Sequence, residues 1–307
     1  MSAVKLNRIT DPVFGNLVQL TNGKVDVRVT VDFGPRIIHC SCAGKENMFW
    51  QDQSKGRLGE KYDVFDDQLI IYGGHRLWIS PEIVPRCYHP DNEPVTVTEV
   101  DDGATFTAAV EKHNMIQKSI TVILESGRPR VLVTHTIENK GLWDVELALW
   151  CLSMMDKGGH EVMPMPCRET GLLPNRAFTF WEYSEMNDSR VRFGKKFITI
   201  TQDVNKKNPF KLGYNNEGGW AAYFNKGQLF VKQFPTYEDG CYPDNGCTYE
   251  TYTNSQMVEM ETLGNLVQLA PGDAATHAEE WDLFEYEYKL THDEDELEKI
   301  LESFSEK

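Results

Sequence analysis

The chain has 307 residues, of which 40% are hydrophobic and 11% aromatic, so it can bury a sizeable core and is not a disordered protein. Its formal net charge of −16 argues against nucleic acid and anionic membranes as partners, because both attract basic surfaces. No window approaches the ~18 apolar residues of a membrane span, and no apolar signal region opens the chain. We therefore expect a cytoplasmic protein, although one that had lost a signal peptide would have the same sequence.

Short segments of alternating polar and apolar residues follow one another along almost the whole chain. Turn-forming glycine, proline, aspartate and asparagine residues separate them. The predicted strands are 25–34, 36–42, 70–80, 94–100, 104–112, 118–126, 130–139, 144–155, 197–202, 219–225, 228–234, 247–253, 257–264 and 277–288. Strands at hairpin-like spacing predict an all-β fold, a large antiparallel sandwich.

The C-terminal segment has a different, helical pattern. Leu297, Ile300, Leu301 and Phe304 recur at the spacing of one helix face, after an acidic first turn. This pattern predicts a short helix over about 292–305. Because no linker or repeat divides the chain, we expect residues 1–307 to form a single domain.

The cysteines and the missing motifs bear on cofactors. The chain has seven cysteines in no tight framework, which is typical of reduced thiols. HxH, HExxH and CxxC motifs are absent, as are glycine-rich nucleotide loops, so we expect neither a metal nor another cofactor.

The densest group of chemically capable residues is "GGHRLWISPE", residues 73–82. In an extended strand His75 shares a face with Leu77 and Ile79, which is typical of a buried structural histidine. Arg76 and Trp78 share the opposite face, where a guanidinium and an indole can hold a sugar. A stacked surface pair is the alternative, and the two glycines could host a bulge that turns His75 towards a cleft.

A second group consists of carboxylates near the C-terminus. Period two places Glu259 and Glu261 on one face of their strand. A turn at 253–256 would place Glu250 opposite Glu259, an arrangement that a cation or ligand must stabilise. Lys232, inside the apolar segment 229–234, could be that cation if it points inward, whereas on an edge strand it would simply be solvated. The alternative is a solvated acidic hairpin.

Three stretches together resemble the galactose-mutarotase-like superfamily, which includes aldose 1-epimerases. "DFGPRIIHCSCAGKENMFW" is similar to its opening strands and "GNLVQLAPGDAATHAEEWDLF" to its closing strands. "GGHRLWISPEIVPRCYHPDN" looks like the signature of one bacterial branch. The resemblance covers roughly residues 12–286 and implies an antiparallel β-supersandwich.

The resemblance also implies roles for particular residues. A carboxylate base in these proteins corresponds to Glu261, with Glu259 as its neighbour, and Arg86 lies in a segment that borders the sugar cleft. The position of the usual acid histidine holds Trp150, which cannot deliver a proton but can stack on a sugar. His75, or His160 in a predicted loop, would have to replace that acid.

These observations lead to three hypotheses about function. The first is an aldose epimerase with Glu261 or Glu259 as base and His75 as acid. Its sugar would be held by a set of binding residues: Arg76, Trp78, Glu82, Arg86, Trp150, Lys232 and Glu250. The second is a sugar-binding protein without turnover, and the third is a lyase or isomerase for an acidic sugar. In each case the expected partner is a small carbohydrate, and we expect a monomer or weak homo-oligomer.

Overall fold

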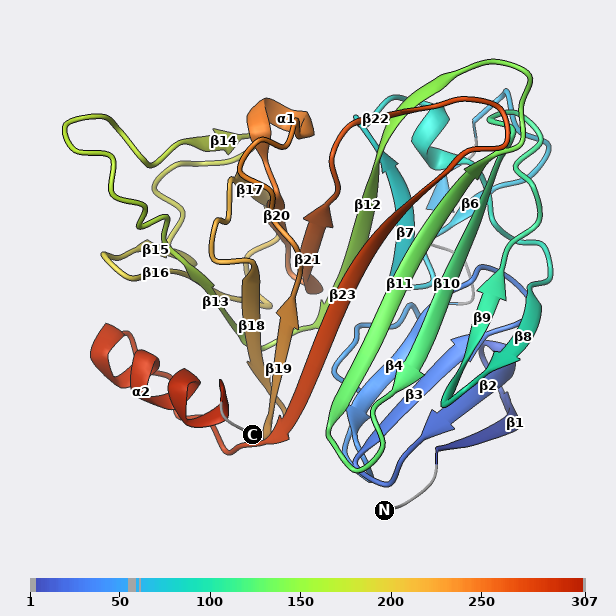
Figure 1. Ribbon diagram of the computed structural model, residues 1–307. Coiled ribbons are helices and arrows are strands. Elements are labelled where there is room, and N and C mark those ends of the chain that lie inside the picture. Colours follow the sequence, from blue (N-terminus) through green and yellow to red (C-terminus); the bar gives the residue numbers. More distant parts are fainter. Residues whose placement is uncertain (1–3, 55–58, 61, 306–307) are drawn as a thin grey trace.

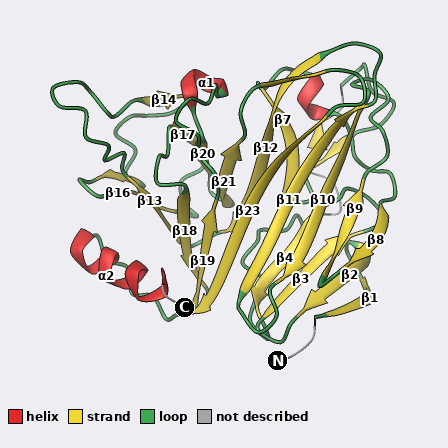
Figure 2. Cartoon of the chain, in the orientation of Figure 1, coloured by secondary structure: helices red, strands yellow, loops and turns green. Residues whose placement is uncertain are grey.

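The computed structural model describes residues 4–54, 59–60 and 62–305. Two antiparallel β-sheets dominate this part of the chain and face each other across a common core (Figure 1). Helices contribute little (Figure 2). The predicted all-β antiparallel fold with a short C-terminal helix is confirmed.

The first sheet contains the strands that carry most of the residues discussed below. Its order is β1 (Lys5–Asp11), β2 (Gly15–Thr21), β3 (Val25–Thr30), β4 (Ile37–Cys42), β7 (His75–Ser80), β12 (Val145–Asp156), β21 (Met257–Leu263), β20 (Tyr249–Thr253), β17 (Phe210–Tyr214) and β14 (Phe178–Phe180). A short strand, β22 (Val267–Leu269), pairs with the beginning of β12.

The second sheet packs against the first. Its order is β15 (Val191–Phe193), β16 (Phe197–Thr201), β13 (His160–Pro164), β18 (Trp220–Asn225), β19 (Gln228–Gln233), β23 (Ala274–Glu285), β11 (Arg130–Asn139), β10 (Ile116–Leu124), β9 (Gly103–Thr107) and β8 (Thr96–Val100). The remaining elements are the pair β5 (Gly59–Glu60) and β6 (Leu69–Ile70), the single turns η1 (Arg86–Tyr88) and α1 (Pro243–Gly246), and helix α2 (Glu294–Ser305).

Two segments differ from the sequence-based expectation. His160, predicted in a loop, begins strand β13 and is buried. The alternation in that segment is hidden because all but the last of its residues are buried, as is typical of a strand covered on both faces. Helix α2 starts two residues later than predicted and packs through Leu297 on the outer face of the second sheet. No described helix is long and apolar enough to cross a membrane.

Strand β12 is buried on both faces. Leu149 and Cys151 point into the main core between the sheets. Trp150 and Leu152 point the other way, into a separate cluster with Trp78. Loop residues and η1 complete that cluster, so the first sheet has a covered outer face rather than a solvated one.

An ion pair lies inside the core between the sheets. The Lys232 ammonium is 3.1 Å from a Glu279 oxygen, and both side chains are fully buried. Glu279 also accepts hydrogen bonds from Thr262 and from the Trp281 indole, so both of its oxygens are occupied. Lys232 therefore pairs with Glu279, and its predicted pairing with the carboxylates at 250, 259 and 261 is wrong.

Breaking this pair should destabilise the fold. We expect Glu279→Gln to lower the free energy of unfolding by about 3–5 kcal/mol, because it leaves the Lys232 ammonium buried without a counter-charge. Adding Lys232→Met should recover part of the loss. Denaturant unfolding measures both effects. The exposed neighbour Glu280 provides the control, since Glu280→Gln should change stability by no more than about 0.5 kcal/mol. Equal effects of the two glutamate substitutions would contradict a structural role for the pair.

Candidate functional site

Strands β7, β12, β21, β20 and β17 lie side by side in the first sheet (Figure 1), and several of the predicted residues share its outer face. Their register forms a row in which Arg76 lies opposite Leu152, Leu152 opposite Glu261, and Glu261 opposite Glu250. We call the charged and aromatic residues of this face the outer-face cluster: Arg76, Trp78, Trp150, Lys211, Glu250, Glu259 and Glu261.

The pairing of Glu250 differs from the prediction, which placed it opposite Glu259. Glu250 lies opposite Glu261, and Tyr252 lies opposite Glu259. The turn begins one residue later than expected, because the Asn254 side chain accepts hydrogen bonds from the backbone N–H groups of residues 256 and 257. Moving a turn by one residue changes the pairing by two, so all three carboxylates stay on the same face.

Two glycines set the direction of β7. Gly73 and Gly74 have φ values of +88° and +73°, which favour glycine. A Cβ on Gly74 would lie 2.4 Å from the carbonyl oxygen of Ile37, so no other residue fits. This path turns Arg76 and Trp78 outward and His75 into the core.

Lys211 holds the centre of the outer-face cluster. Its Nζ lies 2.8 Å from Oε2 of Glu250 and 2.8 Å from Oε2 of Glu261. The indoles of Trp150 and Trp181 flank the ammonium, with ring centroids 4.7 and 4.6 Å away. A cation between two carboxylates and two aromatic rings is firmly fixed.

Burial and neighbouring charges shift the pKa values of this cluster. Burial opposes the Lys211 ammonium, but Glu261 and Glu250 outweigh that effect and raise its pKa, so Lys211 stays charged. Burial, together with the charge of Glu261, raises the pKa of Glu259 to about 8. Glu259 is therefore largely protonated at neutral pH, although it lies on the same strand as Glu261.

Several polar atoms of the cluster are buried and lack a hydrogen-bond partner among the described residues. They are Oε1 of Glu250, Oε1 of Glu261, and Nε and Nη1 of Arg76. The Arg76 guanidinium stacks on Trp78 at 3.4 Å from the ring centroid. Buried polar groups normally have hydrogen-bond partners, so a water or ligand bound at this face would find both donors and acceptors.

The cluster is less deeply buried on the side of β20 and β21. Glu259 and Tyr252 are half-buried there, and Tyr183 is 44% exposed. Tyr183 and Trp181 belong to a loop that is pinned to β17, since the Ser184 hydroxyl bonds both the backbone N–H and the carbonyl of Lys211.

The other predicted residues lie elsewhere or at the margin. Glu82 is exposed and accepts a hydrogen bond from the Tyr88 hydroxyl. Arg86 donates to the backbone carbonyl of Glu146. Lys232 lies in the core behind the sheet. Lys211, rather than Lys232, is the lysine of the site. Lys211 is the only charged residue in the segment 210–214, and the same pattern drew attention to Lys232. The sequence could therefore have identified Lys211 in the same way.

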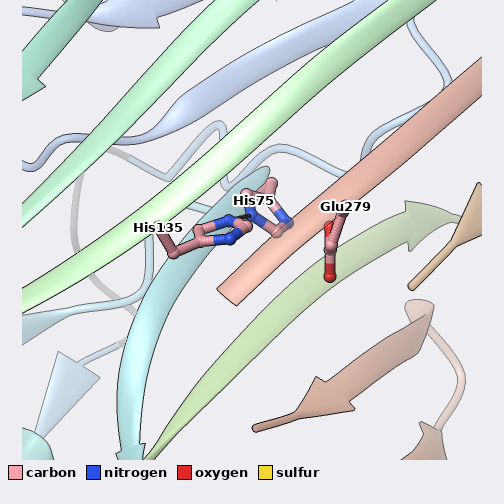
Figure 3. Close-up of side chains that lie close together, drawn as sticks. All are labelled: His75, His135 and Glu279. Atoms are coloured by element: carbon pink, nitrogen blue, oxygen red, sulfur yellow. Dashed lines mark hydrogen bonds between the residues drawn. The ribbon is translucent and has the colours of Figure 1, made fainter. Parts of the chain in front are cut away.

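His75 belongs to a second polar group, inside the core. Its Nδ1 contacts the Ser153 hydroxyl at 2.8 Å, and its Nε2 lies 2.6 Å from Nε2 of His135 (Figure 3). Burial lowers its pKa well below the usual value, so it is neutral. It is thus on the opposite side of the sheet from Glu261. His160, the other candidate acid, bonds Thr201 on the second sheet.

Two overlapping groups in this core have residue types that bind transition metals. One is His75, His135 and Glu279, and the other is Cys151, His277 and Glu279. The ring nitrogens of His75 bond Ser153 and His135, while Lys232 already neutralises the Glu279 carboxylate. These partners favour a buried polar network that joins the two sheets over a metal centre.

Comparisons with known proteins identify the fold. No protein-family model matches the chain, and no curated protein matches it significantly. Among solved structures, a galactose mutarotase-like protein from Lactobacillus casei superposes with a TM-score of 0.55 and 11% identity, covering 87% of this chain and 100% of that one. A candidate aldose 1-epimerase from Klebsiella pneumoniae has a TM-score of 0.61 and 11% identity, covering 99% and 87%.

A third structure contains the same fold as part of a larger protein. A TPR-domain-containing protein from Parabacteroides distasonis has a TM-score of 0.61 and 13% identity over 89% of this chain, which spans only 48% of that protein. The agreement along almost the whole chain confirms the fold that the sequence resemblance implies. The described residues thus have the β-supersandwich fold of these galactose mutarotase-like structures.

Proposed function

We propose that this protein binds a sugar on the outer-face cluster and interconverts its anomers, as an aldose 1-epimerase does. One observation carries the proposal: unpartnered buried oxygens of Glu250 and Glu261 and unpartnered N–H groups of Arg76 share one face. Sugar hydroxyls both donate and accept hydrogen bonds, so one sugar would satisfy both kinds of group. The indoles of Trp78 and Trp150 pack against each other beside these groups.

Glu261 is the base in this proposal. Its Oε2 accepts hydrogen bonds from Lys211 and from the Trp150 indole, both at 2.8 Å, which hold the carboxylate in one orientation. Its Oε1 has no partner and is left to accept a proton from an anomeric hydroxyl. Trp150, at the position of the expected histidine, thus serves to orient the base.

Glu259 replaces His75 as the acid. It lies two residues from Glu261 on the same face, so their Cα atoms are about 6.6 Å apart. Its raised pKa leaves it protonated while Glu261 acts as base. Two carboxyls with different environments divide the acid and base roles in this way.

The reaction then needs no other group. Glu261 takes the proton of the anomeric hydroxyl while Glu259 gives its proton to the ring oxygen, and the bond between that oxygen and the anomeric carbon breaks. The open-chain aldehyde rotates about its terminal carbon–carbon bond. The two carboxyls reverse their roles, the ring closes on the other face of the carbonyl, and both return to their initial protonation states.

A sugar-binding protein without turnover is the second candidate. It is favoured by the inward direction of His75 and by the tryptophan at the histidine position, since neither residue can act as acid at the cluster. Exchange NMR across a panel of aldoses, combined with calorimetric binding, separates the two. Binding without faster anomer exchange would support this candidate and contradict the epimerase.

Removing the base should abolish most of the activity. We expect Glu261→Gln to reduce the anomerisation rate at least about 100-fold, because general base catalysis typically contributes that much or more. The measurement is polarimetry or exchange NMR, with a thermal melt to establish folding. Glu99→Gln, an exposed change of the same type on β8, should leave the rate unaltered. An active, folded Glu261→Gln variant would show that another group is the base.

The acid should appear in the pH dependence. We expect the rate to fall as the pH rises through about 8, because Glu259 then loses the proton that it must donate. Glu259→Gln should be slower and should lack this alkaline decline. If the variant kept the same decline, the titrating acid would be a different group.

A further inference from the structure

We propose that the substrate of this site is a sugar acid, whose carboxylate binds between the buried arginines Arg36 and Arg76. The inference rests on the proposed sugar site but goes beyond it, because it names the substrate class. Neither of the catalytic glutamates takes part in it.

Two arginines lie opposite each other across neighbouring strands. Ile37 of β4 pairs with His75 of β7. Continuing this antiparallel register by one residue places Arg36 opposite Arg76. Both side chains are buried, at 2% and 1% exposure. Like charges directly opposite each other destabilise a sheet unless anions lie beside them.

The two guanidinium groups differ in their partners. Arg36 forms a two-point ion pair with Asp91 but keeps its Nε without a partner among the described residues. Arg76 has no hydrogen-bond acceptor at Nε or Nη1, and it lies flat against Trp78. The three orphaned N–H groups come from the two adjacent side chains.

The nearby carboxyls do not balance Arg76. Glu250 and Glu261 are engaged with the Lys211 ammonium, and Asp91 is engaged with Arg36. Glu259, the remaining close carboxyl, is largely protonated because its pKa is raised to about 8. A buried guanidinium without a counter-charge is costly, and a ligand anion would remove that cost.

The planar shape of the Arg76 guanidinium favours a carboxylate as its ligand. A guanidinium that stacks on an indole presents its N–H groups in one plane, and a planar carboxylate matches that plane with two parallel hydrogen bonds. The chain's net charge of −16 slows the approach of anions. Charges beyond about 8 Å are screened at physiological salt, so the two adjacent arginines decide the affinity once the sugar is in the site.

Matched sugar pairs test this inference. Galacturonate and galactose differ only at carbon 6, where a carboxylate replaces a hydroxymethyl group, and glucuronate and glucose form a second pair. We expect calorimetry to show at least about 10-fold tighter binding of a uronate than of its neutral partner, because hydrogen bonds between a guanidinium and a carboxylate are stronger than those to a neutral hydroxyl. Arg76→Gln should remove this preference, and Arg76→Lys should retain part of it.

The controls separate this inference from the proposed function. Arg8→Gln removes the same charge from an exposed position on edge strand β1 and should leave the preference intact. Equal affinities for uronates and neutral sugars in the parent protein would overturn the inference, and so would tighter, Arg76-dependent binding of galactose 6-phosphate than of galacturonate. Uronate binding without anomer exchange would contradict the epimerase and leave the carboxylate site standing.

Discussion

The outer face of the first sheet depends on one buried ammonium. Lys211 joins carboxylates from two adjacent strands, Glu250 and Glu261, that would otherwise repel each other directly across the ladder. Burial and the charge of Glu261 raise the pKa of Glu250, and the Lys211 cation opposes the charge repulsion between the two carboxyls. The same contact fixes one oxygen of each carboxyl and leaves the other without a partner among the described residues.

The candidate site lies on strands of the first sheet whose outer face is covered by other residues. Strand β12 buries both of its faces, and Trp150 and Leu152 pack under loop residues on the outer side. Side chains on such a strand cannot move far, because backbone pairing holds them on both edges. Glu261 lies on the neighbouring strand and has the same rigidity, which is what accurate positioning of a catalytic carboxylate requires.

Sequence patterns predicted the fold and the directions in which side chains point. They predicted less well which residues those side chains contact. Alternation placed His75 on one face of β7 and Arg76 on the other, and the structure has this arrangement. Period two cannot say which sheet a strand joins. Lys232 was therefore assigned to the carboxylates, although it lies between the sheets and Lys211 is the lysine on the outer face. The pairing of Glu250 was mispredicted because alternation does not show where a turn begins. The Asn254 side chain sets the start of this turn by a local hydrogen bond.

The position of Trp150 links these observations to chemistry. An indole N–H can only donate, so at this position it holds Glu261 and cannot exchange a proton with a sugar. If the site is catalytic, the acid must therefore come from another residue on the same face, since the neutral His75 is separated from it by the sheet. Glu259 meets that requirement, because the charge of Glu261, the proposed base, helps to keep Glu259 protonated. In the proposed mechanism the base therefore helps to raise the pKa of the acid.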